Sequence, residues 1–165
     1  MLERCIGVEH GAAETYERLA DRFSEDRPFR DFWLGMAADE REHAHKLSTW
    51  RALLELTPEN RHPAADGFEA DLLALENLVR DSEKRALQVF TADEAFRLAL
   101  ALEMSELDTI YTTLVQSSPI KRFADIEDTR HHELGRHHEA LIREIRNRSK
   151  DEKNLYDAEL LTAEG

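Results

Sequence analysis

Residues 28 to 47 read Pro28-Phe-Arg-Asp-Phe-Trp-Leu-Gly-Met-Ala-Ala-Asp-Glu-Arg-Glu-His-Ala-His-Lys-Leu47. Side chains spaced by three or four residues there define one face of a helix. The face contains Phe29, Phe32, Trp33, Met36, Glu40, His43, Leu47, Trp50 and Leu54. Only Glu40 and His43 on it are ionisable, and such groups are costly to bury without a partner. They either bind a metal ion, pair with a neighbouring helix or lie at the wet edge of the face.

The composition favours one helical domain. The chain has 165 residues, of which 41% are hydrophobic and 35% charged, with only six Gly and four Pro. The net charge of −13 (22 basic against 35 acidic residues) argues against nucleic acid and membrane surfaces as partners. The single cysteine, Cys5, excludes an internal disulfide and a multi-thiolate metal site within one chain. The chain lacks the pattern of a signal peptide or membrane span, so we expect a cytoplasmic protein.

The first two helices should form an antiparallel pair. The first is predicted from residue 2 to about 24, with Glu9 as the one carboxylate on its apolar face and Tyr16 two turns later. A short turn follows, in which Ser24 or Asp26 can cap the second helix. The second helix should end near Leu56.

The second pair follows a long crossover at about 57–90, which includes a helical pattern from Phe68 to about Gln88 without histidine. A capping box, Thr91-Ala-Asp-Glu94, should start the third main helix. Its apolar face carries Phe96, Leu100, Glu103, Leu107, Ile110 and Leu114. The fourth helix presents Ile120, Phe123, Ala124, Glu127, His131, Leu134, His138, Leu141 and Ile145. Residues 148–165 form a polar tail, which either adds a short helix or frays.

The two pairs repeat one pattern of ionisable residues. Each first helix supplies a lone inward carboxylate, and each second helix supplies a carboxylate and a histidine. The set is Glu9, Glu40 and His43, then Glu103, Asp128 or Glu127, and His131. The partners are offset by four residues relative to the turn in both pairs. Carboxylates with a few imidazoles suit iron or manganese, so the sequence predicts an all-α four-helix bundle over residues 1–147 with a two-metal site between its pairs.

Other polar residues receive supporting or surface roles. Tyr16 and Tyr111 are expected to donate hydrogen bonds to site carboxylates. His138 should lie at the edge of the core, with a contact to the site as the alternative. His132 and His137 fall away from the apolar face and should be exposed to solvent.

The sequence resembles the rubrerythrin branch of the ferritin-like superfamily over residues 2 to about 146. Glu9 with Tyr16, the segment Asp39-Glu-Arg-Glu-His43, and Glu103-x-x-Glu106 with Tyr111 carry the resemblance. It implies that Glu9, Glu40, His43 and Glu103 are metal ligands and that Glu106 is an extra carboxylate responsive to redox state. The fourth helix departs from the family, because Asp128 stands where the pattern has Glu. The ligand there is therefore Asp128 or Glu127, or this half of the site is weakened.

The resemblance implies reduction of hydrogen peroxide or dioxygen at a carboxylate-bridged pair of iron ions, or of iron and manganese, as ferrous iron is oxidised. An external electron donor such as a rubredoxin-like protein is expected, because the cysteines of a rubredoxin domain are missing. A homodimer is expected from the fold. The alternatives are an iron-handling ferroxidase or storage protein, and a non-catalytic helical bundle with a vestigial or structural metal site.

Overall fold

The computed structural model of the chain describes residues 1–56, 68–106 and 124–163, and every regular element in these ranges is an α-helix. The helices there are α1 (Leu2–Arg22), α2 (Arg27–Leu56), α3 (Phe68–Ala86), α4 (Ala92–Glu106), α6 (Ala124–Arg148) and α7 (Glu152–Ala163). The predicted all-α class is confirmed. None of these described helices is long and apolar enough to cross a membrane.

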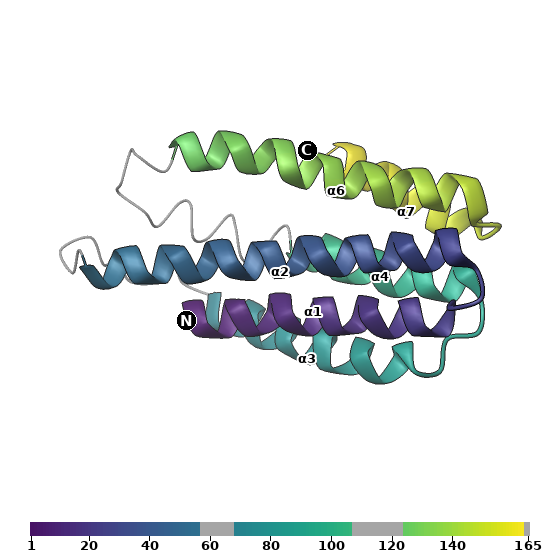
Figure 1. Cartoon of the computed structure of the whole chain (residues 1–165), viewed down its shortest axis with the longest axis horizontal. Helices are drawn as coiled ribbons and strands as arrows, with labels where there is room; N and C mark the ends of the chain where they lie inside the picture. The colour runs from purple at the N-terminus through teal and green to yellow at the C-terminus, as the bar shows by residue number, and fades with distance from the viewer. Residues whose placement is uncertain (57–67, 107–123, 164–165) are drawn as a thin grey trace.

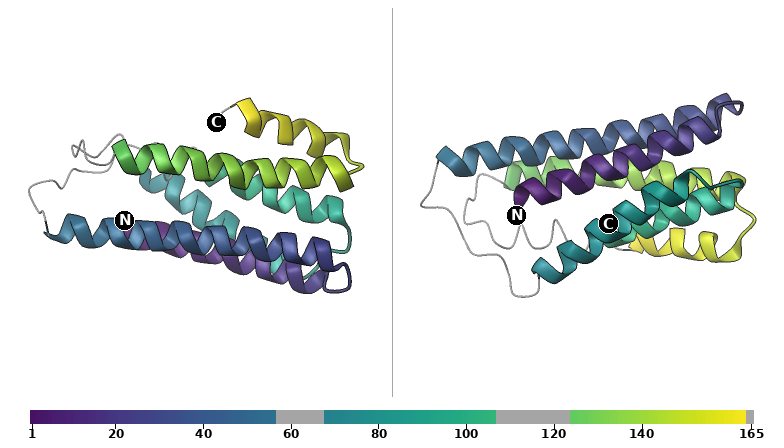
Figure 2. Two further views of the ribbon diagram at one scale, coloured as in Figure 1. Left: turned by 45° about the horizontal axis from the view of Figure 1, so that its top comes forward. Right: turned by 90° about the horizontal axis from the view of Figure 1, so that it is seen from below.

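The helices run nearly parallel to one long axis (Figure 1). α1 and α2 form an antiparallel hairpin, and α3 packs against α1. α4 contacts α1, α3, α6 and α7, so it links the hairpin to the C-terminal helices. α6 extends alongside α2, and α7 folds back beside α6 (Figure 2). Side chains of α1, α2, α4 and α6 can therefore meet in one interior.

Two helix starts are set by local hydrogen bonds that the sequence predicts. Asp26 caps α2, because its Oδ1 accepts a hydrogen bond from the Phe29 amide at 3.2 Å. At the start of α4, the Glu94 amide donates to Thr91 Oγ1 at 3.2 Å. The Thr91 amide donates in return to Glu94 Oε2 at 3.0 Å. This reciprocal pair is the predicted capping box, and it fixes where the helix carrying Glu103 begins.

The C-terminal helix is docked rather than frayed. Ser149, between α6 and α7, donates through Oγ to Asp93 Oδ1 at 2.6 Å. Asn154 of α7 is fully buried and donates through Nδ2 to the Asp93 carbonyl oxygen at 3.0 Å. The turn that follows α6 is thereby tied to the first turn of α4. These bonds hold the C-terminal end of α6 against α4.

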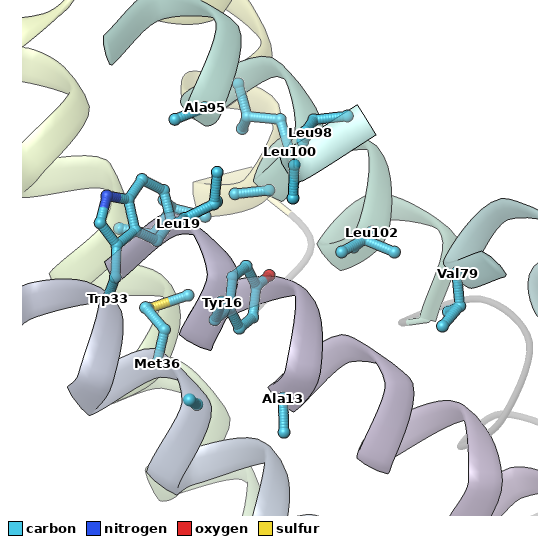
Figure 3. Packing of buried hydrophobic residues seen from close by; sticks show 14 of the residues in the cluster. Ala13, Tyr16, Leu19, Trp33, Met36, Val79, Ala95, Leu98, Leu100 and Leu102 are labelled. Atoms are coloured by element: carbon cyan, nitrogen blue, oxygen red, sulfur yellow. The ribbon is translucent and has the colours of Figure 1, made fainter. Parts of the chain in front are cut away.

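Aromatic side chains fill the interior near the α1–α2 turn. Trp33 is fully buried, and its ring stacks on Tyr16 with the ring centroids 5.8 Å apart. Phe29 and Phe96 lie against Trp33 at centroid distances of 5.4 and 5.8 Å. Leucines of α4 close this core from the other side, as Figure 3 shows for Leu98, Leu100 and Leu102. The aromatic core anchors one end of the bundle and leads through Tyr16 toward the polar interior.

Gly11 allows α1 and α3 to approach closely. A Cβ atom added at this position would lie 2.3 Å from Val79 Cγ1 and 3.1 Å from Glu83 Oε1. The distance to Val79 is well inside van der Waals contact, and its β-branched side chain on a helix has few other rotamers. The absence of a side chain at residue 11 is therefore a packing requirement.

We expect Gly11→Ala to destabilise the fold by about 1–3 kcal/mol, because an overpacked interface forces neighbouring side chains or backbone to shift. Urea unfolding monitored by circular dichroism measures the change. Gly7→Ala is the matched control on the same helix, since a Cβ there meets nothing within 4 Å. That variant should gain up to roughly 1 kcal/mol from helix propensity. Equal effects of the two substitutions would contradict the close packing of α1 on α3.

Candidate metal centre

Five ionisable side chains from four helices converge in the interior. They are Glu9 of α1, Glu40 and His43 of α2, Glu103 of α4 and His137 of α6. Their exposed fractions are 1%, 1%, 6%, 3% and 2%. Burial of this many charged groups is unfavourable unless each has a partner. The helices therefore enclose a polar site within an otherwise apolar core.

The five residues form two groups that share Glu40. One group is Glu9, Glu40 and His43, and the other is Glu40, Glu103 and His137. Within each group, one ligand atom per residue lies within 4.8 Å of the others. The two oxygens of Glu40 divide between the groups. Oε2 lies 2.9 Å from His43 Nδ1, and Oε1 lies 3.1 Å from His137 Nε2.

The Glu9 carboxylate is under-satisfied in its group. Neither of its oxygens has a hydrogen-bond partner in the described part of the chain, and the same holds for Glu40 Oε1. Glu9 Oε2 lies 3.7 Å from His43 Nδ1, which is an ion-pair distance but too long for a good hydrogen bond. A buried carboxylate without a donor is an unusual and costly arrangement. A cation between Glu9, Glu40 and His43 would remove that cost.

Glu103 is held more tightly in the second group. Its Oε1 accepts a 2.6 Å hydrogen bond from the Tyr16 hydroxyl and lies 2.9 Å from His137 Nε2. Its Oε2 lies 3.1 Å from His138 Nε2. On the far side of the His137 ring, Nδ1 lies 3.0 Å from Asp39 Oδ2. Asp39 thus accepts from Nδ1 and directs Nε2 toward Glu40 and Glu103, an orienting role typical of carboxylates behind metal-binding histidines.

Burial and mutual charge shift the pKa values of the whole site. Burial raises the pKa of Glu9 to about 8, and the nearby Glu40 charge adds to the effect. Burial alone would lower the pKa of His43, but the hydrogen bond to Glu40 and the nearby charge of Glu9 raise it to about 10. Burial would lower the pKa of His137, but the charge of Glu103 and hydrogen bonds to Asp39, Glu103 and Glu40 together raise it well above its usual value. Burial would raise the pKa of Glu103, but the charge of His137 and the contacts with His137 and His138 hold it well below its usual range.

Without metal, the site is therefore balanced by protons at neutral pH. His43 and His137 are cationic, Glu40 and Glu103 are anionic, and Glu9 is largely protonated. The two imidazolium ions then balance the charges of the two carboxylates. Metal binding must release these protons, because only the neutral imidazole and the charged carboxylate act as ligands.

The structure brings together four of the predicted ligands, namely Glu9, Glu40, His43 and Glu103. Tyr16 makes the expected kind of contact, a hydrogen bond to a site carboxylate. The predicted Tyr111 lies outside the described residues. The side chains of Glu106, Glu127, Asp128 and His131 are also outside the described part, so their roles stay predictions.

The prediction for His137 was wrong. We expected it to face solvent, yet it is 2% exposed and contacts both Glu40 and Glu103. α6 is covered by α4 and α7 as well as facing α2, so its buried arc is wider than one apolar stripe. A signal was present in the sequence, because His137 lies four and eight residues before the fully buried Leu141 and Ile145. The expected His131 lies six residues earlier, about 9 Å along a helix axis.

His138 lies in the site rather than at the edge of the core. It is 5% exposed, and its Nε2 contacts Glu103 Oε2. The structure therefore contains the contact between His138 and the site, which was the alternative expectation for this residue.

The arrangement defines a buried carboxylate–imidazole centre with donor atoms for two cations. Three carboxylates and two imidazoles are a donor set that suits iron or manganese better than a thiolate-preferring metal. Comparisons with protein-family models, curated proteins and solved structures find no match to this chain. The chemistry of the centre must therefore be argued from its own residues.

We expect the metal-free protein to lose stability as the pH rises from about 6.5 to 8. The folded state keeps the proton on Glu9 up to a pKa of about 8 and that on His43 up to about 10, whereas the unfolded chain loses them near their ordinary values of 4.5 and 6.5. Over this window the folded state binds more protons, so the free energy of unfolding falls by up to about 1.4 kcal/mol per pH unit for each group. Urea unfolding of chelator-treated protein at several pH values measures the slope.

Glu9→Gln should make this slope shallower, because the amide does not titrate. Glu14→Gln is the control, since Glu14 is exposed on the same helix. A slope that is unchanged in Glu9→Gln, or reduced equally in both variants, would contradict the raised pKa of Glu9.

Proposed function

We propose that the protein is a rubrerythrin-like binuclear metal protein that reduces hydrogen peroxide or dioxygen at a carboxylate-bridged iron site. In this proposal α1, α2, α4 and α6 form a ferritin-like four-helix bundle, and α3 belongs to its crossover connection. The observation that carries the proposal is the sharing of Glu40 between two buried carboxylate–imidazole groups. Two-metal sites in such bundles are built from inward Glu residues and Glu-x-x-His motifs, and Glu40 and His43 of α2 form one such motif.

The donor atoms divide naturally between two ions. Glu9, Glu40 Oε2 and His43 Nδ1 would hold one, and Glu40 Oε1, Glu103 and His137 Nε2 would hold the other. Glu40 would then contribute one oxygen to each group. The unsatisfied oxygens of Glu9 support the first position, since they have no other described partner.

Iron bound in this centre would supply redox chemistry, since two ferrous ions becoming ferric provide the two electrons that, with two protons, convert one hydrogen peroxide to two waters. The protein's own residues prepare the site for this task. Asp39 accepts the Nδ1 proton of His137 and so keeps Nε2 directed inward. Tyr16 and His138 contact opposite oxygens of Glu103 and limit its rotation. The aromatic core around Trp33 keeps bulk water from that end of the site.

Electrons to restore the ferrous state would come from a separate protein or small donor. Cys5 is the only cysteine of the chain, and it is buried, so the chain itself cannot form a four-cysteine iron centre. A rubredoxin-like partner fits this requirement.

We expect the purified protein, reconstituted anaerobically with ferrous iron, to hold close to two iron ions per chain. Glu9→Gln should reduce the content to about one, because it removes a ligand from one group only. The neutral amide resembles the protonated carboxyl that Glu9 carries without metal, so this variant should still fold. Glu40→Gln should lose both ions, since Glu40 belongs to both groups. Elemental analysis and circular dichroism measure metal content and folding together.

Glu55→Gln is the control for these variants, because Glu55 is exposed on the same helix as Glu40. Consumption of hydrogen peroxide by the iron-loaded protein, with a chemical reductant, then tests the redox proposal. Full metal content without peroxide or dioxygen turnover would favour a structural metal site. Wild-type protein that binds no iron would overturn the proposal and leave a helical bundle without redox chemistry.

A further inference from the structure

His138 is a buried imidazole that contacts the centre without belonging to either of its two groups. The side chain is 5% exposed, and its Nε2 lies 3.1 Å from Glu103 Oε2. The second group consists of Glu40, Glu103 and His137, and His138 reaches this group through Glu103. A buried imidazole beside a ligand carboxylate can act in two ways. It supports the carboxylate by a hydrogen bond, or it binds the same ion.

Two neighbouring imidazoles of α6 flank the Glu103 carboxylate. The ring centroids of His137 and His138 lie 5.9 Å apart, and the ring planes are inclined by 54°. His137 Nε2 lies 2.9 Å from Glu103 Oε1, whereas His138 Nε2 lies 3.1 Å from Glu103 Oε2. Each oxygen of Glu103 therefore has one imidazole nitrogen beside it. An ion that both oxygens bind would meet an imidazole on either side.

The separation of His138 from Glu103 suits two ligands of one ion. Nitrogen and oxygen ligands bind zinc at about 2.0–2.2 Å, so two ligand atoms at a right angle around such an ion lie roughly 3 Å apart. His138 Nε2 and Glu103 Oε2 are 3.1 Å apart. The same distance separates His137 Nε2 from Glu40 Oε1 within the second group. His138 is thus as close to a carboxylate of this group as one of its own members is.

The second group also has a position for another donor. It supplies three residues, and one of them, Glu40, is shared with the first group. A fourth protein donor would fill a position that otherwise falls to water. The carboxylates among the described side chains of α6 do not supply it, since Glu139 is exposed and Glu144 accepts a hydrogen bond from Arg148. The side chain that α6 presents to Glu103 besides His137 is His138.

We propose that His138 binds the ion of the second group through Nε2, so that α6 contributes two adjacent histidine ligands. The inference rests on the proposed function and adds a ligand to its centre. It departs from the pattern predicted from the sequence, in which the fourth helix supplies one carboxylate and one histidine. A neutral imidazole at this position leaves the described centre with three carboxylates, those of Glu9, Glu40 and Glu103.

The first test identifies the ligand nitrogens directly in the wild-type protein. Protein labelled with nitrogen-15 histidine is loaded with cadmium-113, whose nuclear spin couples to the nitrogen atoms that bind it. We expect this coupling in the NMR spectrum at Nδ1 of His43 and at Nε2 of both His137 and His138. Coupling at His43 and His137 but not at His138 would overturn the inference and leave the proposed centre intact. Protein that binds neither cadmium nor ferrous iron overturns both.

The second test uses His138→Gln, because the Gln amide can donate a hydrogen bond to Glu103 but is a weak ligand for iron. Tyr16→Phe is the comparison, since it removes the other described hydrogen bond to the same carboxylate without removing a ligand. Loss of a supporting contact typically weakens metal binding by about 10–100-fold, so we expect His138→Gln to weaken binding of the second ion by more than about 100-fold. Anaerobic titration with ferrous iron measures both affinities.

His45→Gln is the control for a change of histidine that leaves the centre intact, because His45 is exposed on α2. It should bind two iron ions like the wild type, and circular dichroism checks that every variant is folded. His138→Gln protein that binds the second ion no more weakly than Tyr16→Phe would show that His138 only supports Glu103. If His138→Gln does not fold, the cadmium spectrum of the wild type decides the question.

Discussion

The fold depends on the balance of charge between acidic and basic side chains that are buried away from water. Three carboxylates and two imidazoles meet between four helices, where an isolated charge would be very unfavourable. Each of the four helices contributes an ionisable residue. Burial of that residue is favourable only when residues of the other helices pair with it. Removing Glu40 would leave two imidazolium groups short of their shared partner. The site therefore constrains how the helices pack together, and it is also a candidate metal site.

The two ends of the interior are stabilised by different kinds of interaction. Near the α1–α2 turn, Phe29, Trp33 and Phe96 pack by burial and ring contact alone, so this part of the fold needs no ligand. Further along, the interior is polar and is supported by a second layer of contacts. Tyr16 joins the two regions, since it stacks on Trp33 and donates to Glu103. A rigidly packed apolar core beside a polar centre helps to hold the side chains of that centre at fixed separations.

The halves of the centre differ in how well they are satisfied without metal. Glu103 has contacts on both oxygens, and His137 is oriented by Asp39. Glu9 has no hydrogen bond from the described residues, and its pKa is raised by burial. The two groups are therefore stabilised to different extents in the metal-free protein. A pocket between α2 and α6 is lined by both His43 and His137.

The sequence by itself determined the helices and most of the buried ionisable residues of the centre. Apolar periodicity, the Asp26 cap and the Thr91–Glu94 capping box are local signals, and each is present in the structure. Glu9, Glu40, His43 and Glu103 could be identified because each interrupts an otherwise apolar helix face. Only the tertiary structure showed that His137 of α6 reaches the centre. Periodicity fixes the face of a helix, but the height of α6 against α2 is set by contacts between distant residues, such as that of His137 with Asp39.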